Sequence, residues 1–269
     1  MTDQAASQLP SRWIYPDWPA PISIHAGTTT RAGGRSRPPY ASFNLGAHVG
    51  DSVEAVRANR NCLVNRLSLP KEPYWLEQHH GNRVIDPSDP NAGRQADGAC
   101  TAATGVVCAI LTADCLPLLL CNRAGSRVAA LHCGWRGLAG GVISSGLKQM
   151  GYLSEDIVAW LGPAISAPVY EVGEEVYAAF AACDPSLTTA FTPTRPGHWL
   201  LDLYASTRSV LKAQGVHAIY GGHHCTYREP TLFFSHRRDG GVTGRMATLI
   251  WIATEASASF CEQSDLSID

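Results

Sequence analysis

The sequence predicts a single α+β domain in which mixed β-sheets are covered by helices. Strand-like apolar runs are interspersed with segments of helical periodicity, but the two do not alternate strictly, which disfavours a purely parallel sheet. The chain has 269 residues, and a single domain of that size buries roughly three quarters of its unfolded surface. No internal repeat or low-complexity segment suggests a repeat architecture.

The chain begins with a polar, proline-rich segment, and residues 1–20 are expected to form a loosely held arm. The single domain then covers residues 21–269. Within it, residues 22–31 read as a short strand that leads into a loop over residues 31–46. Glycine, proline and serine disfavour regular structure in this loop, and a loop of that length in a compact domain is usually functional.

A helix is expected after the loop, followed by four strands. Asp51 can cap the helix, and Pro70 lies beyond its end. The apolar residues that share one face of this helix are Val53, Val56, Leu63, Val64 and Leu67. Strand-like runs follow around residues 74–77, 105–111, 116–121 and 127–132.

The second half of the chain contains three expected helices. The first covers residues 135–150, is weakened by glycines and stops at Gly151; the second covers residues 173–183. Asp202 caps the third, which runs through Gln214 and is followed by a glycine suited to a left-handed end. Strands are expected at residues 157–161, 217–222, 231–241 and 245–253.

The charge pattern favours a small-molecule partner. The chain has 21 basic and 23 acidic side chains, and the basic ones are scattered except for Arg237 and Arg238, which read as a solvated turn. A nucleic-acid-binding protein would show a concentrated basic surface, so no nucleic-acid partner is expected. Polar residues and a proline interrupt the apolar run over residues 106–121, which predicts no membrane span.

Nine cysteines are an odd number without paired spacing, and the amino terminus has no positive region followed by an apolar one. Reduced thiols and a cytoplasmic location therefore fit best. Cys62, Cys108 and Cys121 lie in apolar surroundings, where free cysteine usually behaves as a small hydrophobic residue. No obligatory protein partner is evident from the sequence.

Three residues form a candidate metal site. Cys115 and His132 lie at the ends of two apolar, strand-like runs, and His80 lies upstream in EQHHG. Two histidines and a cysteine can hold zinc through three protein ligands and leave a fourth position for water or substrate. The spacings of 35 and 17 residues are too long for one finger-like loop, so tertiary folding has to assemble such a site.

Each of the three residues has a neighbour that could also approach a metal: His79, Asp114 and Cys133. Consecutive side chains on a strand point to opposite faces, so only one member of each pair can face a common point if these segments are extended. From the residues alone, the choice within each pair stays open.

Eleven runs between residues 30 and 252 carry a resemblance that makes this choice: TRAGG, FNLGAHVGD, WLEQHHGNRV, ADG, TADCLPLLLC, HCGWRG, LGPAI, EVGEEV, DLYASTRSVL, CTY and FFSHRRDGGVTGRMATLIWI. In this order they resemble the YfiH family, also known as the polyphenol oxidase or multicopper polyphenol oxidase laccase family. The resemblance implies an α/β/β/α sandwich and a zinc site formed by His80, Cys115 and His132. It also implies purine nucleoside phosphorylase activity on adenosine and inosine, with adenosine deaminase and S-methyl-5'-thioadenosine phosphorylase activities.

Two residues depart from the family pattern: His79, where an apolar residue is usual, and Cys133, where alanine is usual. Strand alternation predicts that both turn away from the metal, His79 being hydrogen-bonded elsewhere and Cys133 a small packing residue. Copper is an alternative to zinc, because Cu(II) binds most nitrogen and sulfur sites more tightly.

A purine deaminase and a phosphorylase need further groups beside the metal. Asp114 is the carboxylate nearest in sequence for proton transfer, with Glu174 and Glu175 as alternatives. A phosphate is best held by guanidinium groups, and the candidates for that role are Arg31 and Arg136.

Three other residues are candidates for contacts with the substrate. Asn44 could add a neutral polar contact, and Ser235 and His236 could line the pocket entrance.

Two other functions stay open. A copper-dependent polyphenol oxidase fits the older family name, but a multicopper site needs more closely spaced histidines than His80 and His132. Alternatively, Cys115 could be a nucleophile activated by His132 in a hydrolase that edits peptidoglycan precursors. Residues 223–225 (HHC) form a second metal-competent cluster, but a structural zinc normally needs four ligands.

Overall fold

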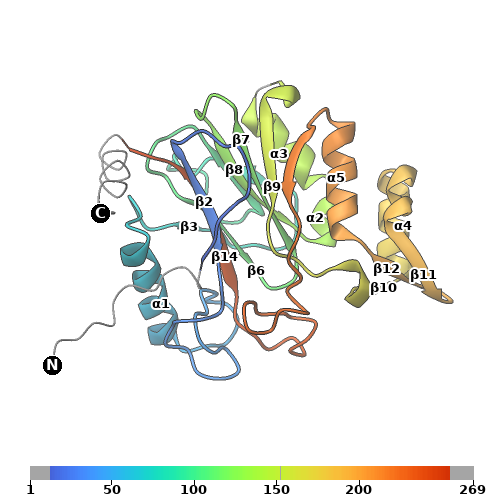
Figure 1. Ribbon diagram of the computed structural model, residues 1–269, viewed down its shortest axis with the longest axis horizontal. Coiled ribbons are helices and arrows are strands. Elements are labelled where there is room, and N and C mark those ends of the chain that lie inside the picture. The colour runs from blue at the N-terminus through green and yellow to red at the C-terminus, as the bar shows by residue number, and fades with distance from the viewer. Residues whose placement is uncertain (1–12, 152, 255–269) are drawn as a thin grey trace, which may run out of the picture.

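The computed structural model describes residues 13–151 and 153–254. Two β-sheets are stacked on each other, and helices cover both outer faces (Figure 1). The layers therefore run α, β, β, α, which confirms the predicted α+β class with mixed sheets.

The five-stranded sheet has the strand order β1-β2-β14-β6-β3. Its strands are β1 (Trp13–Ile14), β2 (Ile24–Thr29), β3 (Tyr74–Trp75), β6 (Cys108–Thr112) and β14 (Met246–Ile252). Neighbouring strands are antiparallel, except that β3 and β6 are parallel. Trp13 is buried and pairs with Thr29, so this part of the predicted arm belongs to the sheet, while residues 1–12 lie outside the described residues.

The six-stranded sheet has the strand order β13-β9-β7-β8-β5-β4. Its strands are β4 (Val84–Ile85), β5 (Gly98–Thr101), β7 (Leu116–Asn122), β8 (Val128–Cys133), β9 (Ile157–Leu161) and β13 (Ala218–Gly221). The pairs β13–β9 and β4–β5 are parallel, and the other pairs are antiparallel.

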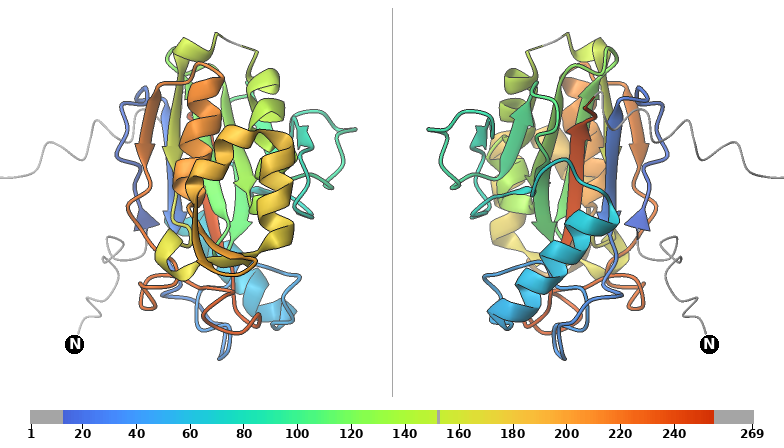
Figure 2. Two further views of the ribbon diagram at one scale, coloured as in Figure 1. Left: turned by 90° about the vertical axis from the view of Figure 1, so that its right-hand side faces the viewer. Right: turned by 90° about the vertical axis from the view of Figure 1, so that its left-hand side faces the viewer.

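Helices cover each sheet on one side (Figure 2). Helix α1 (Val53–Arg66) lies on the five-stranded sheet, whereas α2 (Trp135–Ala139), α3 (Val142–Met150) and α5 (Leu203–Ala213) lie on the six-stranded sheet.

A smaller unit lies beside these layers. It combines α4 (Glu174–Cys183) with a sheet of β10 (Glu171–Gly173), β12 (His198–Leu201) and β11 (Phe191–Arg195). Short helical turns are η1 (Ser154–Asp156), η2 (Ala167–Val169) and η3 (Pro185–Ala190). Among the described helices, none has the length and apolar character needed to cross a membrane.

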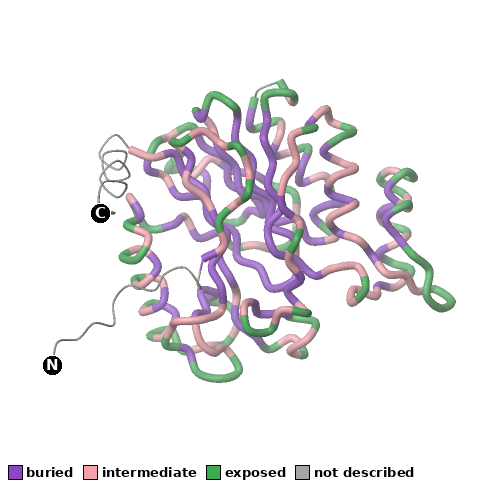
Figure 3. Tube along the Cα trace, in the orientation of Figure 1, coloured by how far each residue is buried: buried purple, intermediate pink, exposed green. Residues whose placement is uncertain are grey.

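The two-residue period of the strands explains the layers. On β7, Leu118 and Leu120 pack toward the helices, whereas Leu119 and Cys121 pack between the sheets. On β6, Ile110 joins the layer between the sheets. Both faces of these central strands are covered, so their sequences are continuously apolar, and buried residues concentrate along them (Figure 3).

The cysteine predictions can be checked for the part of the chain that the structure describes. Cys108 and Cys121 are fully buried among apolar residues, as predicted, and Cys62 is half-buried at the edge of the core under α1. The eight described cysteines are all free thiols.

Two helix predictions need correction. Helix α1 is capped by Ser52 rather than Asp51, because Ser52 Oγ accepts a hydrogen bond from the Ala55 backbone N–H at 3.3 Å. The predicted helix over residues 135–150 is divided into α2 and α3, because Gly141 between them adopts a left-handed conformation with φ of 83°.

Residues 231–241 form turns instead of the predicted strand. Arg238 is half-buried there, and its guanidinium donates to the Thr226 carbonyl at 2.7 Å and the Phe233 carbonyl at 2.9 Å. It therefore holds two loops together and is not the solvated residue expected from the sequence.

Candidate metal centre

The three predicted metal ligands come together where β6 turns into β7. Cys115 lies in that turn, His132 lies near the end of the adjacent strand β8, and His80 lies in the loop after β3. One ligand atom from each residue lies within 4.8 Å of the other two. The rings of His80 and His132 meet edge to face, with centroids 4.7 Å apart. Within residues 13–151 and 153–254, this is the one cluster of its kind.

The backbone explains how His80 and Cys115 reach the same point. His80 has φ of 64° and Asp114 has φ of 101°, so neither segment is an extended strand. The strand alternation expected for these two pairs therefore does not apply. It does apply to His132 and Cys133 within β8, and Cys133 packs into the core on the helical side, away from the cluster, as predicted.

The buried carboxylate of Asp97 connects two of the ligands. Its Oδ1 lies 2.8 Å from His132 Nδ1, so the other ring nitrogen of His132 is directed to the cluster. Oδ1 also accepts the His80 backbone N–H at 2.8 Å, and Oδ2 accepts the Gly81 backbone N–H at 2.7 Å. Sequence reasoning missed Asp97 as a site residue, although it lies in the ADG run that resembles the family.

His79 is not part of the cluster, and its ring bonds to Asp97 instead. Its Nδ1 lies 3.2 Å from Asp97 Oδ2, and its side chain is 54% exposed. His79 is therefore a second imidazole on the carboxylate that orients His132.

Gly134 is required by close packing at the cluster. A Cβ atom at this position would lie 2.9 Å from Cys115 Sγ and 3.1 Å from His80 Cδ2. Real Cβ atoms essentially never come as close as the first of these distances, so a side chain here would displace a ligand. This explains the glycine that follows His132 and Cys133 in HCGWRG.

The surroundings favour a charged Cys115. Burial raises the pKa of its thiol, but the imidazoles of His132 and His80 outweigh burial and hold the pKa below its ordinary value. Burial lowers the pKa of His132, but Cys115 and Asp97 outweigh burial and hold it above its ordinary value. Without a metal, the pair therefore favours a thiolate and an imidazolium, and metal binding has to displace the imidazolium proton.

The cluster fits a metal ion with an open coordination position. His80 is exposed, Cys115 is half-buried and His132 is 3% exposed, so one side of the cluster can be reached from solvent. Two imidazole nitrogens and a thiolate are ligands that both zinc and copper accept. The spacing of the ligand atoms is compatible with one ion held by three residues.

Two residues that were not predicted interact with the thiol through its charge. Burial lowers the pKa of Arg245, and the negative charges of Cys115 and Asp114 oppose this effect. Burial raises the pKa of Tyr170, and Cys115 acts in the same direction. Arg245 lies in the run that also contains Ser235 and His236, and Tyr170 immediately precedes EVGEEV.

Asp114, the predicted proton-transfer residue, is 7% exposed and forms two hydrogen bonds. Thr226 Oγ1 donates to Asp114 Oδ1 at 2.6 Å, and the Arg237 backbone N–H donates to Oδ2 at 2.7 Å. The carboxylate thereby holds two loops against the turn that carries Cys115. Glu174 and Glu175 are exposed in the first turn of α4, where acidic side chains favour the helix terminus.

Arg31, the predicted phosphate ligand, is engaged with the backbone. Its Nε and Nη2 donate to the Ala41 carbonyl at 3.1 and 3.0 Å, and Nη1 donates to the Pro230 carbonyl at 3.1 Å. Its guanidinium also lies 4.7 Å from the centre of the Phe234 ring. These contacts are those of a residue that holds two loops together.

Asn44 and Ser235, two of the predicted substrate contacts, are both fully buried. Asn44 Nδ2 donates to Asp51 Oδ2 at 2.9 Å, and Asn44 Oδ1 accepts the Arg245 backbone N–H at 2.9 Å. Ser235 Oγ accepts the Arg238 backbone N–H at 3.2 Å. Side chains without exposed surface cannot meet a substrate unless the loops rearrange.

Arg136 and His236, in contrast, are exposed. The Arg136 guanidinium lies over the Trp135 ring, 4.2 Å from its centre, and forms no hydrogen bond within the described residues. It remains available to an anion.

The second candidate cluster is not assembled in the structure. His223 Nε2 lies 3.2 Å from Asp17 Oδ2, whereas His224 Nδ1 lies 2.9 Å from Glu229 Oε2. The Cys225 thiol accepts a hydrogen bond from Ser166 at 2.9 Å. The three side chains thus have separate partners, in agreement with the low ligand number in the sequence.

Fold and cluster together define an α/β/β/α protein with a cluster of two histidines and one cysteine that could hold a metal ion. Residues 25–253 match the family described as multi-copper polyphenol oxidoreductase laccase, and the chain belongs to this family.

Relatives cover most of the chain. The purine nucleoside phosphorylase YfiH of Escherichia coli strain K12 is 47% identical over 243 residues, which are 90% of this chain and 99% of that protein. A purine nucleoside phosphorylase of Pseudomonas aeruginosa is 46% identical over 241 residues, or 89% of this chain and 98% of that protein.

Solved structures agree with the fold. The crystal structure of a Neisseria meningitidis protein is 47% identical with a TM-score of 0.86, and the match covers 90% of this chain and 100% of that chain. The structure of YlmD from Geobacillus stearothermophilus is 33% identical with a TM-score of 0.83, covering 92% of this chain and 98% of that chain.

Proposed function

We propose that this protein is a zinc-dependent purine nucleoside phosphorylase that acts on adenosine and inosine. We include adenosine deaminase and S-methyl-5'-thioadenosine phosphorylase activities at the same centre. The observation that carries the proposal is the open cluster of His80, Cys115 and His132. It is supported by relatives of nearly half identical sequence whose names state purine nucleoside phosphorylase.

Zinc suits this centre because it accepts nitrogen and sulfur ligands and keeps an open position in catalytic sites. When bound, it would supply Lewis acidity to an oxygen at that position. Copper would accept the same ligands. However, the described residues contain a single three-ligand cluster, which is too few histidines for the several ions of a multicopper oxidase.

The chain's own residues provide orientation and positive charge. Asp97 holds the His132 ring and the His80 backbone in one arrangement. Arg245 lies close enough to Cys115 for their charges to interact, and Arg136 is exposed on α2. Forked guanidinium groups hold phosphate oxygens well, so Arg136 and Arg245 are the arginines that we assign to the anion.

A proton must also move during deamination. Asp114 lies next to Cys115 in sequence but would have to give up one of its two hydrogen bonds to take part. Glu174 and Glu175 are exposed, and neither forms a side-chain hydrogen bond or ion pair within the described residues. The assignment of the proton donor to Asp114 therefore stays a prediction.

The decisive experiment combines metal analysis with product analysis. Protein purified without added metal is expected to contain about one zinc per chain. Adenosine should then be converted to adenine and ribose 1-phosphate only when phosphate is present. Without phosphate, adenosine should be deaminated to inosine. Removal of the metal with a chelator should stop both reactions.

Two outcomes would contradict the proposal. Full activity of metal-free protein that is abolished by iodoacetamide would favour Cys115 as a nucleophile activated by His132, as in a peptidoglycan-editing hydrolase. Oxidation of phenols by copper-loaded protein, without turnover of nucleosides by the zinc form, would favour the polyphenol oxidase.

Arg31→Ala is expected to impair both nucleoside reactions equally. Its three hydrogen bonds to carbonyls hold loops together, so their loss should lower the free energy of unfolding by about 1–3 kcal/mol. Thermal unfolding and both rates, with and without phosphate, measure this. The matched control is Arg37→Ala, which removes an exposed side chain from the same loop. A selective rise in the Michaelis constant for phosphate would restore Arg31 as the phosphate ligand.

A further inference from the structure

Arginines concentrate in one part of the chain, although the whole chain has a formal net charge of −2. Residues 31–66 contain six arginines but only two carboxylates. The fold brings the loop at residues 33–35 against α1, so part of this charge faces one groove on the outer side of the molecule. The scattered distribution expected from the sequence does not hold for this surface.

The groove lies between the loop and one face of α1. The loop contributes Gly33, Gly34 and Arg35, and the helix contributes residues spaced three or four apart. Those residues are Ala58, Asn59, Asn61, Cys62, Asn65 and Arg66. No carboxylate lines the groove, which is open to solvent and has a volume of about 680 Å³.

Four exposed side chains around the groove are free to bind a ligand. Arg35, Asn61, Asn65 and Arg66 form no side-chain hydrogen bond or ion pair within the part of the chain that the structure describes. Two guanidinium groups can bind phosphate oxygens in bidentate fashion. Two carboxamides one helical turn apart offer donors and acceptors, the type of group that recognises the polar edge of a nucleobase.

The groove is preformed. Asn59 is fully buried at its base, and Asn59 Oδ1 accepts the Arg35 backbone N–H at 2.8 Å. Asn59 Nδ2 donates to the Asn44 carbonyl at 2.8 Å. These bonds tie the loop to α1 without a ligand, so binding would require little ordering of the backbone.

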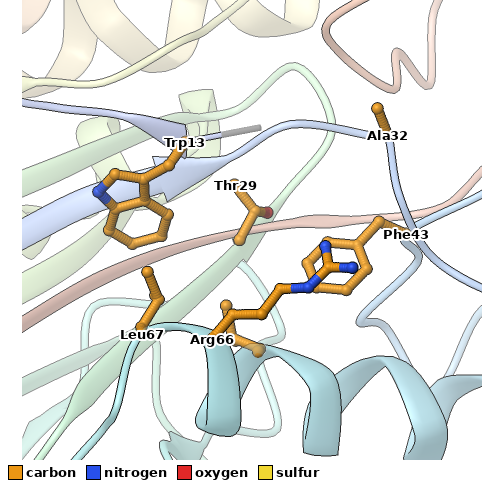
Figure 4. Close-up of a pocket in the computed structure, with 7 residues that line it drawn as sticks. Trp13, Thr29, Ala32, Phe43, Arg66 and Leu67 are labelled. Carbon is orange, nitrogen blue, oxygen red and sulfur yellow. The ribbon is translucent and has the colours of Figure 1, made fainter. Parts of the chain in front are cut away.

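An apolar hollow, shown in Figure 4, shares Arg66 with the groove. It is lined by Trp13, Phe43, Leu63 and Leu67 among others. Its volume of about 20 Å³ is enough for one or two waters but not for a ring. A ligand of the groove is therefore held by the polar side chains.

We propose that this groove binds a nucleoside phosphate, with the phosphates on Arg35 and Arg66 and the base edge on Asn61 and Asn65. The charge of the groove and the absence of carboxylates select an anion, and the two carboxamides select a polar ring. Two unpaired arginines fit the phosphates of one nucleotide better than the continuous backbone of a nucleic acid, which needs a longer basic track. The site is distinct from the metal centre, because none of its lining residues belongs to the His80, Cys115 and His132 cluster.

The test is calorimetric titration of the zinc-loaded protein with ADP, AMP and inorganic phosphate. ADP is expected to bind, more tightly than inorganic phosphate and more weakly as ionic strength rises. The double variant Arg35→Gln and Arg66→Gln should weaken ADP binding about tenfold or more. The matched control is Arg57→Gln, an exposed arginine of α1 outside the groove, which should leave the affinity unchanged within about twofold.

A second titration separates the groove from the metal centre. Saturating inosine should not compete with ADP, and the Cys115→Ser variant should bind ADP as the native protein does. The proposal would be overturned if the double variant bound ADP as tightly as the native protein does, or if inosine displaced ADP. Equal affinity for phosphate and ADP would also overturn the proposal and would indicate a plain anion site. Tight binding of a single-stranded oligonucleotide without binding of ADP would identify a nucleic-acid surface instead.

Discussion

Cys115→Ser is expected to remove most of the zinc from the purified protein and to abolish nucleoside turnover. A hydroxyl is a far poorer zinc ligand than a thiolate, and the surroundings of Cys115 hold the pKa of its thiol below the ordinary value, which favours the thiolate. Mutation of a residue that only bonds to a metal ligand lowers metal affinity about 10–100-fold. Loss of a direct ligand should lower it further. Metal analysis after purification and competition with a chelator measure the effect.

Cys183→Ser is the matched control, because Cys183 is a free, exposed thiol on α4 outside the cluster. It should keep native zinc content and activity. If Cys115→Ser retains both zinc and activity, Cys115 is not a metal ligand. If it retains zinc but loses activity, Cys115 is better explained as a nucleophile.

Asp97→Asn is expected to lower metal affinity about 10–100-fold although Asp97 does not contact the metal. The carboxylate accepts hydrogen bonds from His132 Nδ1 and from the backbone N–H groups of His80 and Gly81. An asparagine presents an NH₂ group to some of these donors, so the His132 ring and the His80 backbone lose their common anchor. The same loss should reduce the free energy of unfolding of the metal-free protein by about 2–4 kcal/mol.

The pH dependence of this difference provides a second measurement. Burial raises the pKa of Asp97, but the hydrogen bonds from His132 and the backbone outweigh it and hold the pKa below its ordinary value. A carboxyl with a lowered folded pKa stabilises the fold above its unfolded pKa, and that contribution disappears as pH falls through the folded value. The stability gap between native protein and Asp97→Asn should therefore be full near neutral pH and shrink in acid.

Asp86→Asn is the control for the general effect of this substitution, because Asp86 lies outside the cluster and its carboxylate accepts hydrogen bonds from Ser88 in a local turn. It should leave metal affinity unchanged. Native metal affinity in Asp97→Asn would show that His132 and His80 are held by the remaining fold alone.

The outlines of the fold could be predicted from local patterns. Runs such as those of β7 and β14 are continuously apolar because both of their faces are covered, and Asp202 caps α5 with its carboxylate on the Ala205 N–H. Predictions failed where the local hydrophobic pattern does not indicate the secondary structure. Strand β11 is exposed at four of its five residues and shows no apolar alternation, and residues 231–241 are apolar in part but are held in turns by Arg238.

The amino-acid sequence by itself supplied the candidate ligands of a metal centre. The family-like motifs imply His80, Cys115 and His132, whereas the residue types alone left the choice between each of them and its neighbour open. Tertiary structure alone decided how the centre is built. The left-handed backbone of His80 and the positive φ of Asp114 cannot be read from residue types, because each depends on hydrogen bonds to partners distant in sequence.

Hydrogen bonds to partners distant in sequence also decide which polar side chains stabilise loops and which lie near the cluster. Asn44 and Arg31 hold loops together in the structure, whereas Asp97 bonds to His132 and the charge of Arg245 interacts with that of Cys115. All four residues suggest binding when met in a sequence. A polar side chain binds a ligand most readily where folding leaves some of its hydrogen-bonding groups unpaired. Which side chains remain free is determined by contacts between segments that lie far apart in the chain.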